Sequence, residues 1–242
     1  MLRRLWMAAL LMAIASVAQA LTVSAAASLG EALREIGARF QAQGGPAVHF
    51  NFAASGVLLQ QLRQGAPVDV LASADEATAQ RGVALGLLEP ASRRVFARNA
   101  LVLVAPIGSA LPQTLADLAR PELRRIALGK PASVPAGRYA EQALQQHGLA
   151  AAVAAKRVPA DNVRQVLDYV ARGEVDAGLV YASDARAAAT RVRKVQRVTG
   201  TDPIVYPALR VKGGQADAQA FIDFLLSPEA QAILARHGFE AP

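Results

Sequence analysis

Small and hydroxyl-bearing residues recur where the sequence predicts that a strand ends and a helix begins. They are Ser28, Ser55, Gly56, the segment 134–137 and the segment 159–162. The first N–H groups of a helix have no partner within the helix, and the helix dipole makes that end positive. In open α/β sheets such helix starts gather in one crevice at the carboxyl ends of the strands. The pattern indicates a site that binds an anion through N–H and hydroxyl groups.

Tyr181 occupies a similar position, between a predicted strand over 177–181 and a predicted helix over 182–189. Taken singly, each of these residues has a plainer explanation. Serine is a common helix N-cap whatever the function, and a tyrosine at a strand end can be a core residue with a satisfied hydroxyl. The joint spacing of the positions carries more information than any one of them.

Other kinds of site find little support in the 242 residues. The chain has no Cys and only three His (His49, His147 and His237), which are far apart, so thiol chemistry is excluded and a metal site is not expected. Neither G-x-G nor G-x-x-x-x-G-K occurs. Asp69 and Asp75 are better explained by a turn and a helix N-cap than by an acid–base pair. We therefore expect no catalytic residue, no enzyme and no cofactor.

Short apolar runs alternate with amphipathic stretches along the chain, which favours an α/β fold with parallel sheets. The predicted strands cover 21–26, 48–53, 68–72, 100–105, 125–128, 156–158, 177–181, 192–198 and 205–211. The predicted helices lie at 29–40, 57–62, 76–85, 137–147, 163–170 and 182–189, with two more around Ser227 and Pro228. No flexible linker separates two halves. A two-lobed protein would therefore cross between lobes on strands, for which 100–106 and 205–211 are the candidates.

The N-terminus is typical of a secretory signal peptide. Arg3 and Arg4 precede an apolar run, and the sequence Ala18-Gln19-Ala20 follows it, which predicts cleavage after Ala20. The run is shorter than the ~20 residues that a membrane-spanning helix needs. The net charge of +7 would suit anionic partners in general, but export argues against nucleic acid. The alternative is that the excess of arginine only keeps the protein soluble.

Ten segments taken in order resemble the periplasmic molybdate-binding proteins of ABC transporters. They are 22–29, 52–55, 65–70, 72–75, 99–106, 134–140, 162–164, 178–185, 206–207 and 238–239. Each motif alone is weak, but the ordered set covers nearly the whole chain after residue 20. The resemblance implies a type II periplasmic-binding-protein fold, in which two α/β lobes are joined by a hinge of crossing strands and the ligand lies in the cleft between them.

The resemblance also implies a ligand and the residues that bind it. The ligand is molybdate or tungstate, held as an oxyanion rather than as a bare metal. Ser28 and Ser55 would supply hydroxyl and backbone donors from the first lobe, Ala136 and Val163 would supply backbone N–H groups from the second, and Tyr181 would supply its phenol O–H. Neutral donors suit this ligand, because molybdate carries no proton at neutral pH and a buried counter-charge is costly to desolvate. Phosphate usually retains a proton and needs an acceptor, while the smaller sulfate must be rejected by cavity size.

The expected organisation and partners follow from the same resemblance. Residues 1–20 form the signal peptide, residues 21–103 with about 208–242 form lobe 1, and residues about 104–207 form lobe 2. The mature protein is expected to be a periplasmic monomer that docks transiently on the permease of an ABC transporter in the inner membrane. Alternatives are a receptor of the same fold for sulfate, phosphate or an organic anion, and an exported sensor module.

Two residues depart from the pattern of the resembled proteins. Lys130 stands where Asp is expected, and it would add a charge to the cleft unless it is an exposed residue on the rim. Gly56 replaces a hydroxyl residue after Ser55, which removes one side-chain donor and keeps the backbone N–H.

Overall fold

The structure is a computed structural model that describes residues 19–242. The predicted signal peptide therefore lies outside the described residues, apart from its last two positions. Among the described residues, no helix combines the length and the hydrophobicity that crossing a membrane requires.

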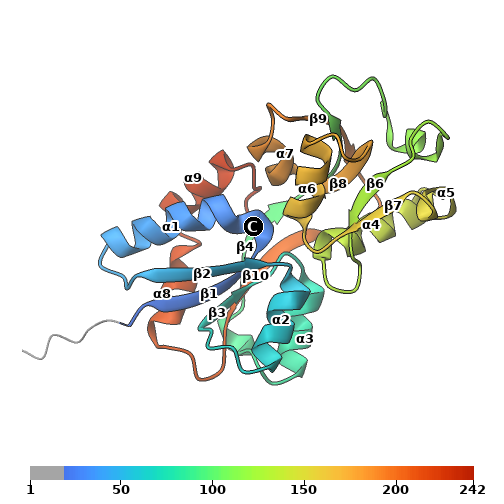
Figure 1. Cartoon of the computed structure of the whole chain (residues 1–242). Coiled ribbons are helices and arrows are strands. Elements are labelled where there is room, and N and C mark those ends of the chain that lie inside the picture. Colours follow the sequence, from blue (N-terminus) through green and yellow to red (C-terminus); the bar gives the residue numbers. More distant parts are fainter. Residues whose placement is uncertain (1–18) are drawn as a thin grey trace, which may run out of the picture.

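Two five-stranded sheets organise the chain, and each is covered by its own helices (Figure 1). The first sheet has the order β2-β1-β3-β10-β4. Its strands are β1 (Leu21–Ala26), β2 (Val48–Ala53), β3 (Val70–Ala72), β4 (Arg94–Asn99) and β10 (Ile204–Arg210). Its helices are α1 (Gly30–Ala42), α2 (Ser55–Arg63), α3 (Glu76–Ala84), α8 (Asp217–Phe224) and α9 (Pro228–Arg236), with the 3-10 turns η1 (Ala27–Leu29) and η2 (Pro90–Ser92). We call this unit lobe 1.

The second sheet has the order β7-β6-β8-β5-β9. Its strands are β5 (Leu101–Pro106), β6 (Ile126–Gly129), β7 (Arg157–Ala160), β8 (Ala177–Tyr181) and β9 (Val192–Val198). Its helices are α4 (Pro135–Gln146), α5 (Ala150–Ala154), α6 (Val163–Ala171) and α7 (Ala182–Ala187), with the 3-10 turn η3 (Leu115–Ala119). We call this unit lobe 2.

The burial and hydrophobicity of the residues along a strand distinguish the inner strands of each sheet from the edge strands. Every residue of β8 is buried, as is every residue of β5 except Pro106, and apolar side chains dominate both. Such continuous apolar runs are typical of strands covered on both faces. In contrast, β2 and β9 alternate between less and more exposed residues, and each forms one edge of its sheet.

The expectation of parallel sheets is only partly correct. Strands β1, β2 and β3 pair in parallel, as do β6, β7 and β8. However, β10 is antiparallel to β3 and β4, and β5 is antiparallel to β8 and β9. Strands β5 and β10 are the first strands that the chain forms after it passes into the other lobe. They are therefore not reached through the strand–helix–strand connection that makes neighbouring strands of a sheet parallel.

The chain passes between the lobes twice. Strand β4 of lobe 1 ends at Asn99 and β5 of lobe 2 begins at Leu101, while β9 of lobe 2 ends at Val198 and β10 of lobe 1 begins at Ile204. The two candidate crossing strands, 100–106 and 205–211, correspond to β5 and β10. Each lies within the sheet of a single lobe, and the chain passes between the lobes just before each of them begins. The predicted lobe boundaries at 103/104 and 207/208 lie within β5 and β10, and we propose to set them at residue 100 and at 199–203.

Candidate functional site

A small cavity lies where helix starts from both lobes meet. It leaves about 10 Å³ of room for the centre of a water-sized sphere. The lining residues come from the ends of β1 and β2, from the starts of η1, α2, α4 and α6, and from the end of β8. They are Ala26, Ala27, Ser28, Ala53, Ala54, Ser55, Ala74, Val134, Pro135, Ala136, Asn162, Val163 and Tyr181. The structure thus brings all five predicted ligand-binding residues to one cavity. Their binding role stays a prediction.

Lobe 1 contributes two buried serines. The Ser55 hydroxyl oxygen accepts a hydrogen bond from the backbone N–H of Ala74 at 3.0 Å, and the Ser28 hydroxyl lies 3.1 Å from that of Tyr206. Both serines are at most 2% exposed. Because each oxygen already has a partner in its own lobe, the two side chains are held in fixed positions at the cavity wall.

Lobe 2 contributes the first turns of α4 and α6. Helix α4 begins at Pro135, which has no N–H, so Ala136 provides its first backbone donor. Helix α6 begins at Val163 after the N-cap Asn162, whose side chain accepts the N–H of Gln165 at 3.0 Å. First-turn N–H groups have no intrahelical acceptor. Ala136 and Val163 therefore each present an N–H group of the kind that binds an anion.

Tyr181 supplies the remaining polar group. Its side chain is 1% exposed, and its hydroxyl has no hydrogen-bond partner among the described residues. Burial, followed by the electrostatic effect of Tyr206, raises the pKa of this phenol well above its ordinary value. The group therefore stays protonated and can donate a hydrogen bond. An unpartnered buried hydroxyl is costly in itself, so its presence at a cavity wall points to a ligand.

The cavity wall carries no formal charge. None of the described residues that line it is Lys, Arg, His, Asp or Glu. No group of three or more His, Asp or Glu side chains that could hold a metal ion occurs within residues 19–242. What the site offers is a set of uncharged donors converging from two lobes, which is suited to an anion that bears no proton.

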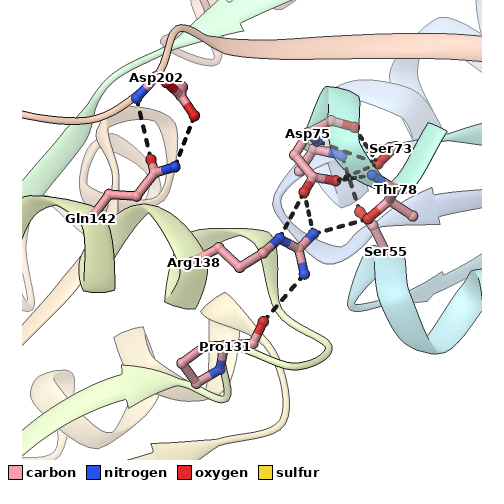
Figure 2. Close-up of polar contacts among 9 residues, drawn as sticks. Ser55, Ser73, Asp75, Thr78, Pro131, Arg138, Gln142 and Asp202 are labelled. Carbon is pink, nitrogen blue, oxygen red and sulfur yellow. Dashed lines mark hydrogen bonds and ion pairs between the residues drawn. The ribbon is translucent and has the colours of Figure 1, made fainter. Parts of the chain in front are cut away.

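Two arginines of lobe 2 reach across to lobe 1 beside the cavity. Figure 2 shows the first, Arg138 of α4, whose guanidinium contacts Asp75 at the start of α3. Its Nε lies 3.0 Å from the Asp75 carboxylate, and Nη2 donates to this carboxylate and to Thr78 Oγ1 at 2.9 Å. The Asp75 carboxylate also caps α3 by accepting the Thr78 N–H, as predicted from the sequence.

The second arginine is Arg164, in the first turn of α6. It donates to the Glu31 carboxylate of α1 at 3.1 and 3.2 Å and to the backbone oxygen of Ser28 at 3.2 Å. Its Nε lies 2.8 Å from Asp184, which is fully buried in lobe 2. Burial raises the pKa of the Asp184 carboxyl to about 6, and the charge of Arg164 opposes that rise.

Neither departure from the resembled pattern puts a charge into the cavity. Lys130 is half exposed and forms an ion pair with Asp161 at 2.5 Å, and neither residue lines the cavity. Gly56 donates its N–H to the backbone oxygen of Ser133 in lobe 2 at 3.0 Å. A Cβ at Gly56 would lie only 2.6 Å from that oxygen, so glycine permits the close approach of the lobes here.

Sequence reasoning missed the interlobe arginines. Arg138 and Arg164 lie within the motifs 134–140 and 162–164, one or two residues beyond the predicted backbone donors. Their partners Asp75 and Glu31 stand 63 and 133 residues away. No local pattern reveals such pairs, although the place of each arginine in the first turns of a donor helix was an available clue.

Comparison with known proteins shows the family and the fold of this chain. Residues 21–240 match the family described as bacterial extracellular solute-binding protein. The chain is 36% identical over 231 residues to the molybdate-binding protein ModA of Escherichia coli (strain K12), covering 90% of this chain and 88% of that protein. The periplasmic molybdate-binding protein of Azotobacter vinelandii is 29% identical and superposes with a TM-score of 0.80, covering 92% of this chain and 99% of that one.

The fold extends to proteins with other ligands. The sulfate-binding protein SubI of Mycobacterium tuberculosis superposes with the same TM-score of 0.80 at 20% identity, covering 92% of this chain and 86% of that one. The expected type II periplasmic-binding-protein fold, with two α/β lobes, is confirmed. With a family match over 220 of its residues and a relative at 36% identity over most of both chains, the chain belongs to the family of bacterial extracellular solute-binding proteins.

Proposed function

We propose that this protein is an exported receptor that binds molybdate in the cavity between its lobes and delivers it to the permease of an ABC transporter. The observation that carries the proposal is the cavity itself: uncharged donors from both lobes surround it, and one of them is a buried phenol that has no partner among residues 19–242. Relatives named as molybdate-binding proteins share about a third of the sequence over nearly the whole chain. The family is one of receptors, which bind their solutes and do not transform them.

The donor set accounts for the choice of anion. Ser28, Ser55, Tyr181 and the N–H groups of Ala136 and Val163 all donate, so a fully deprotonated dianion satisfies them. A protonated phosphate would bring a donor of its own to a site that offers it no dedicated acceptor, and an unpaired buried donor costs about 1–3 kcal/mol. Tungstate has nearly the size and charge of molybdate, and we propose that it binds too.

Sulfate is the harder competitor, because it is also an unprotonated dianion. The fold alone does not decide against it, since a sulfate-binding protein has the same fold. We propose that size decides: the cavity walls are set by rigid helix starts and by small residues such as Ala27, Ala54 and Ala74. A smaller anion cannot contact the donors of both lobes at once.

Binding is coupled to closure of the lobes. The donors lie on two units joined by two chain crossings, so the ligand completes its contacts only when the lobes are together. A ligand with higher affinity for the closed form shifts the population toward it. We propose that the permease recognises this closed form, and that the mature receptor is a monomer released by cleavage after Ala20.

Calorimetric titration of residues 21–242 with molybdate, tungstate, sulfate and phosphate in separate runs tests the proposal. One-to-one binding of the first two, with little heat from the others, is the expected result. The double variant Ser28→Ala, Tyr181→Phe should bind molybdate far more weakly. Unchanged affinity in this variant would remove the assignment of the site, and tight binding of sulfate or phosphate would overturn the ligand.

A further inference from the structure

A chain of buried hydrogen bonds leads from the crossing between the lobes to the cavity wall. Asn99 is the last residue of β4, next to the point where the chain passes into lobe 2. Its amide contacts Ser183 of α7 and Tyr206 of β10, and Tyr206 in turn contacts Ser28. All four residues are at most 5% exposed. None of Asn99, Ser183 and Tyr206 lines the cavity.

The direction of each bond follows from which partners can donate. The Asn99 Oδ1 atom accepts from the backbone N–H groups of Ala100 at 2.9 Å and Ser183 at 3.4 Å, which are donors only. The Nδ2 group must therefore face the hydroxyls. It donates to Ser183 Oγ at 2.9 Å and to the Tyr206 hydroxyl oxygen at 3.3 Å.

The hydrogen bond from Asn99 also decides which hydroxyl donates between Tyr206 and Ser28. Since its oxygen accepts from Asn99, its single proton is free to point at Ser28 Oγ, 3.1 Å away. With an anion in the cavity this arrangement gives both protons an acceptor, since Tyr206 donates to Ser28 and Ser28 donates to the anion. In the reverse arrangement Ser28 would donate to Tyr206, and the phenol proton would have no acceptor among the described residues, at a cost of about 1–3 kcal/mol for a buried unpaired donor. Burial also raises the pKa of the Tyr206 phenol well above its ordinary value, so its proton remains in place.

We propose that Asn99 and Tyr206 form a relay that fixes the Ser28 hydroxyl as a donor into the cavity, so that Tyr206 is a positioning residue which makes the site reject protonated oxyanions. The inference rests on the proposed function, because it concerns how the same cavity selects its anion. Ser55 has a comparable arrangement, since its oxygen accepts the N–H of Ala74. Together the two serines direct both hydroxyl protons toward the ligand.

Tyr206→Phe removes the proton that holds Ser28 and keeps the ring, which packs edge-on against Phe96 and Phe239. In this variant the Ser28 hydroxyl can turn and accept a hydrogen bond from the anion. We expect molybdate and sulfate affinities to fall together, by about five- to tenfold for one hydrogen bond. Phosphate affinity should fall less or rise, so the ratio of phosphate to sulfate affinity increases.

The experiment is calorimetric titration of the wild type, Tyr206→Phe, Ser28→Ala and the double variant with molybdate, repeated in millimolar sulfate or phosphate, so that weak sulfate and phosphate affinities are obtained from competition. Thermal unfolding of each confirms that it folds. The relay predicts that Tyr206→Phe has little further effect on molybdate affinity once Ser28 is alanine, whereas a packing defect would persist in that background. Tyr139→Phe is the matched control, because Tyr139 is a buried tyrosine of lobe 2 that does not line the cavity. Asn99→Ala, measured in parallel, should change the phosphate-to-sulfate ratio in the same direction.

The outcomes separate the two proposals. If the wild type binds molybdate, but the phosphate-to-sulfate ratio is unchanged in Tyr206→Phe and in Asn99→Ala, the relay is wrong and the receptor function stands. If the effects of Tyr206→Phe and Ser28→Ala simply add, the relay is also wrong. A wild type that does not bind molybdate overturns the proposed function, and this inference with it.

Discussion

Two buried tyrosines, Tyr181 and Tyr206, use their hydroxyl groups differently. Tyr206 and Tyr181 are both fully buried, and their rings meet edge-on with centroids 5.9 Å apart. The Tyr206 hydroxyl contacts Ser28 and Asn99, whereas that of Tyr181 has no partner among the described residues. One phenol therefore serves the protein's internal network, and the other remains available to a ligand.

This difference leads to a prediction for Tyr181→Phe. A hydrogen bond to a charged group contributes about 1.5–3 kcal/mol, so molybdate affinity should fall by about ten- to a hundredfold. The free energy of unfolding without ligand should stay the same or rise slightly, because the lost hydroxyl had no internal partner. Calorimetry and urea unfolding measure the two quantities. Tyr169→Phe, outside the cavity on α6, is the control, and equal losses of affinity in both variants would contradict the prediction.

The ligand-binding candidates came from a resemblance, and the structure shows why residues alone left them open. A serine before a helix looks the same whether it caps that helix or faces a ligand. Ser28 and Ser55 differ from ordinary caps only through Tyr206 and Ala74, which lie 178 and 19 residues away. Such contacts depend on the tertiary fold, so no local pattern could have predicted them.

Helix starts are the elements on which the site is built. The N-terminal turns of α2, α4 and α6 all face the cavity, and the long-range arginine contacts begin within one turn of them. The segment 199–203, which leads into β10, is also attached to α4, because Gln142 and Asp202 exchange two hydrogen bonds (Figure 2). The same helix thus contacts the cavity, the opposite lobe and one of the two crossings.

The Asp75–Arg138 pair should favour closure of the lobes. Asp75→Asn keeps the cap of α3, since asparagine is an equally good N-cap, but it removes the charge that attracts Arg138. We expect molybdate affinity to fall by about tenfold, or about 1.4 kcal/mol, while the fold is retained. Titration and small-angle scattering would show weaker binding and a more open ligand-free form.

Arg81→Gln is the matched control for that experiment. Arg81 lies on α3, the helix that Asp75 caps, and it forms no ion pair within residues 19–242. It should bind molybdate like the wild type. If Asp75→Asn also binds like the wild type, the pair does not contribute to closure.

The buried Asp184 of α7 predicts how stability depends on pH. Burial raises its pKa from the ordinary 3.8 to about 6, against the opposing charge of Arg164, with Glu31 and Tyr206 also nearby. The folded state therefore binds this proton more tightly than the unfolded state. Its contribution is largest below about pH 4 and is lost as the pH rises to about 6.

Asp184→Asn tests this dependence, because it removes the titration. Relative to the variant, the wild type should lose on the order of 2–3 kcal/mol of unfolding free energy between pH 4 and 6. Urea unfolding of both proteins at several pH values in that window measures the difference. A difference that is independent of pH, or one in which the wild type gains stability with rising pH, would contradict it.

At the scale of elements, the sequence pattern located most strands and helices. The predicted bounds of β1, β2, β8 and β9 agree with the structure residue for residue. Strand β4 was missed, because Arg94 and Arg98 leave it an apolar run of only three residues, 95–97. The antiparallel strands β5 and β10 were assigned as strands with the wrong orientation, since orientation depends on the lobe from which the chain arrives.

The whole molecule is held in a closed arrangement by contacts that span the lobes. Besides the two arginines, the backbone itself joins them, since Gly56 N–H of α2 donates to Ser133 O at 3.0 Å. The sequence suggested that glycine here merely lacks a donor. The structure shows a different reason for glycine at position 56. The space that a side chain would occupy there is filled by the backbone of the other lobe.

Gly56→Ala should therefore act on closure and leave the fold of each lobe intact. The added Cβ would lie 2.6 Å from Ser133 O and 2.9 Å from Ser133 Cα, which no ordinary contact permits. Once the lobes separate, Ser133 no longer opposes this Cβ, and alanine is compatible with the start of α2. The substitution thus destabilises only the closed state, and the apparent affinity falls with the fraction of closed protein.

We expect Gly56→Ala to bind molybdate at least tenfold more weakly, with no decrease in the thermal unfolding temperature of the ligand-free protein. Small-angle scattering should show that it stays more open than the wild type at the same molybdate concentration. Gly30→Ala is the control, since a Cβ there would meet only the Arg34 guanidinium at an ordinary 3.4 Å. Wild-type affinity in Gly56→Ala would mean that tight binding does not need the 3.0 Å approach of α2 to Ser133, and that closure stops short of the arrangement described for the two lobes.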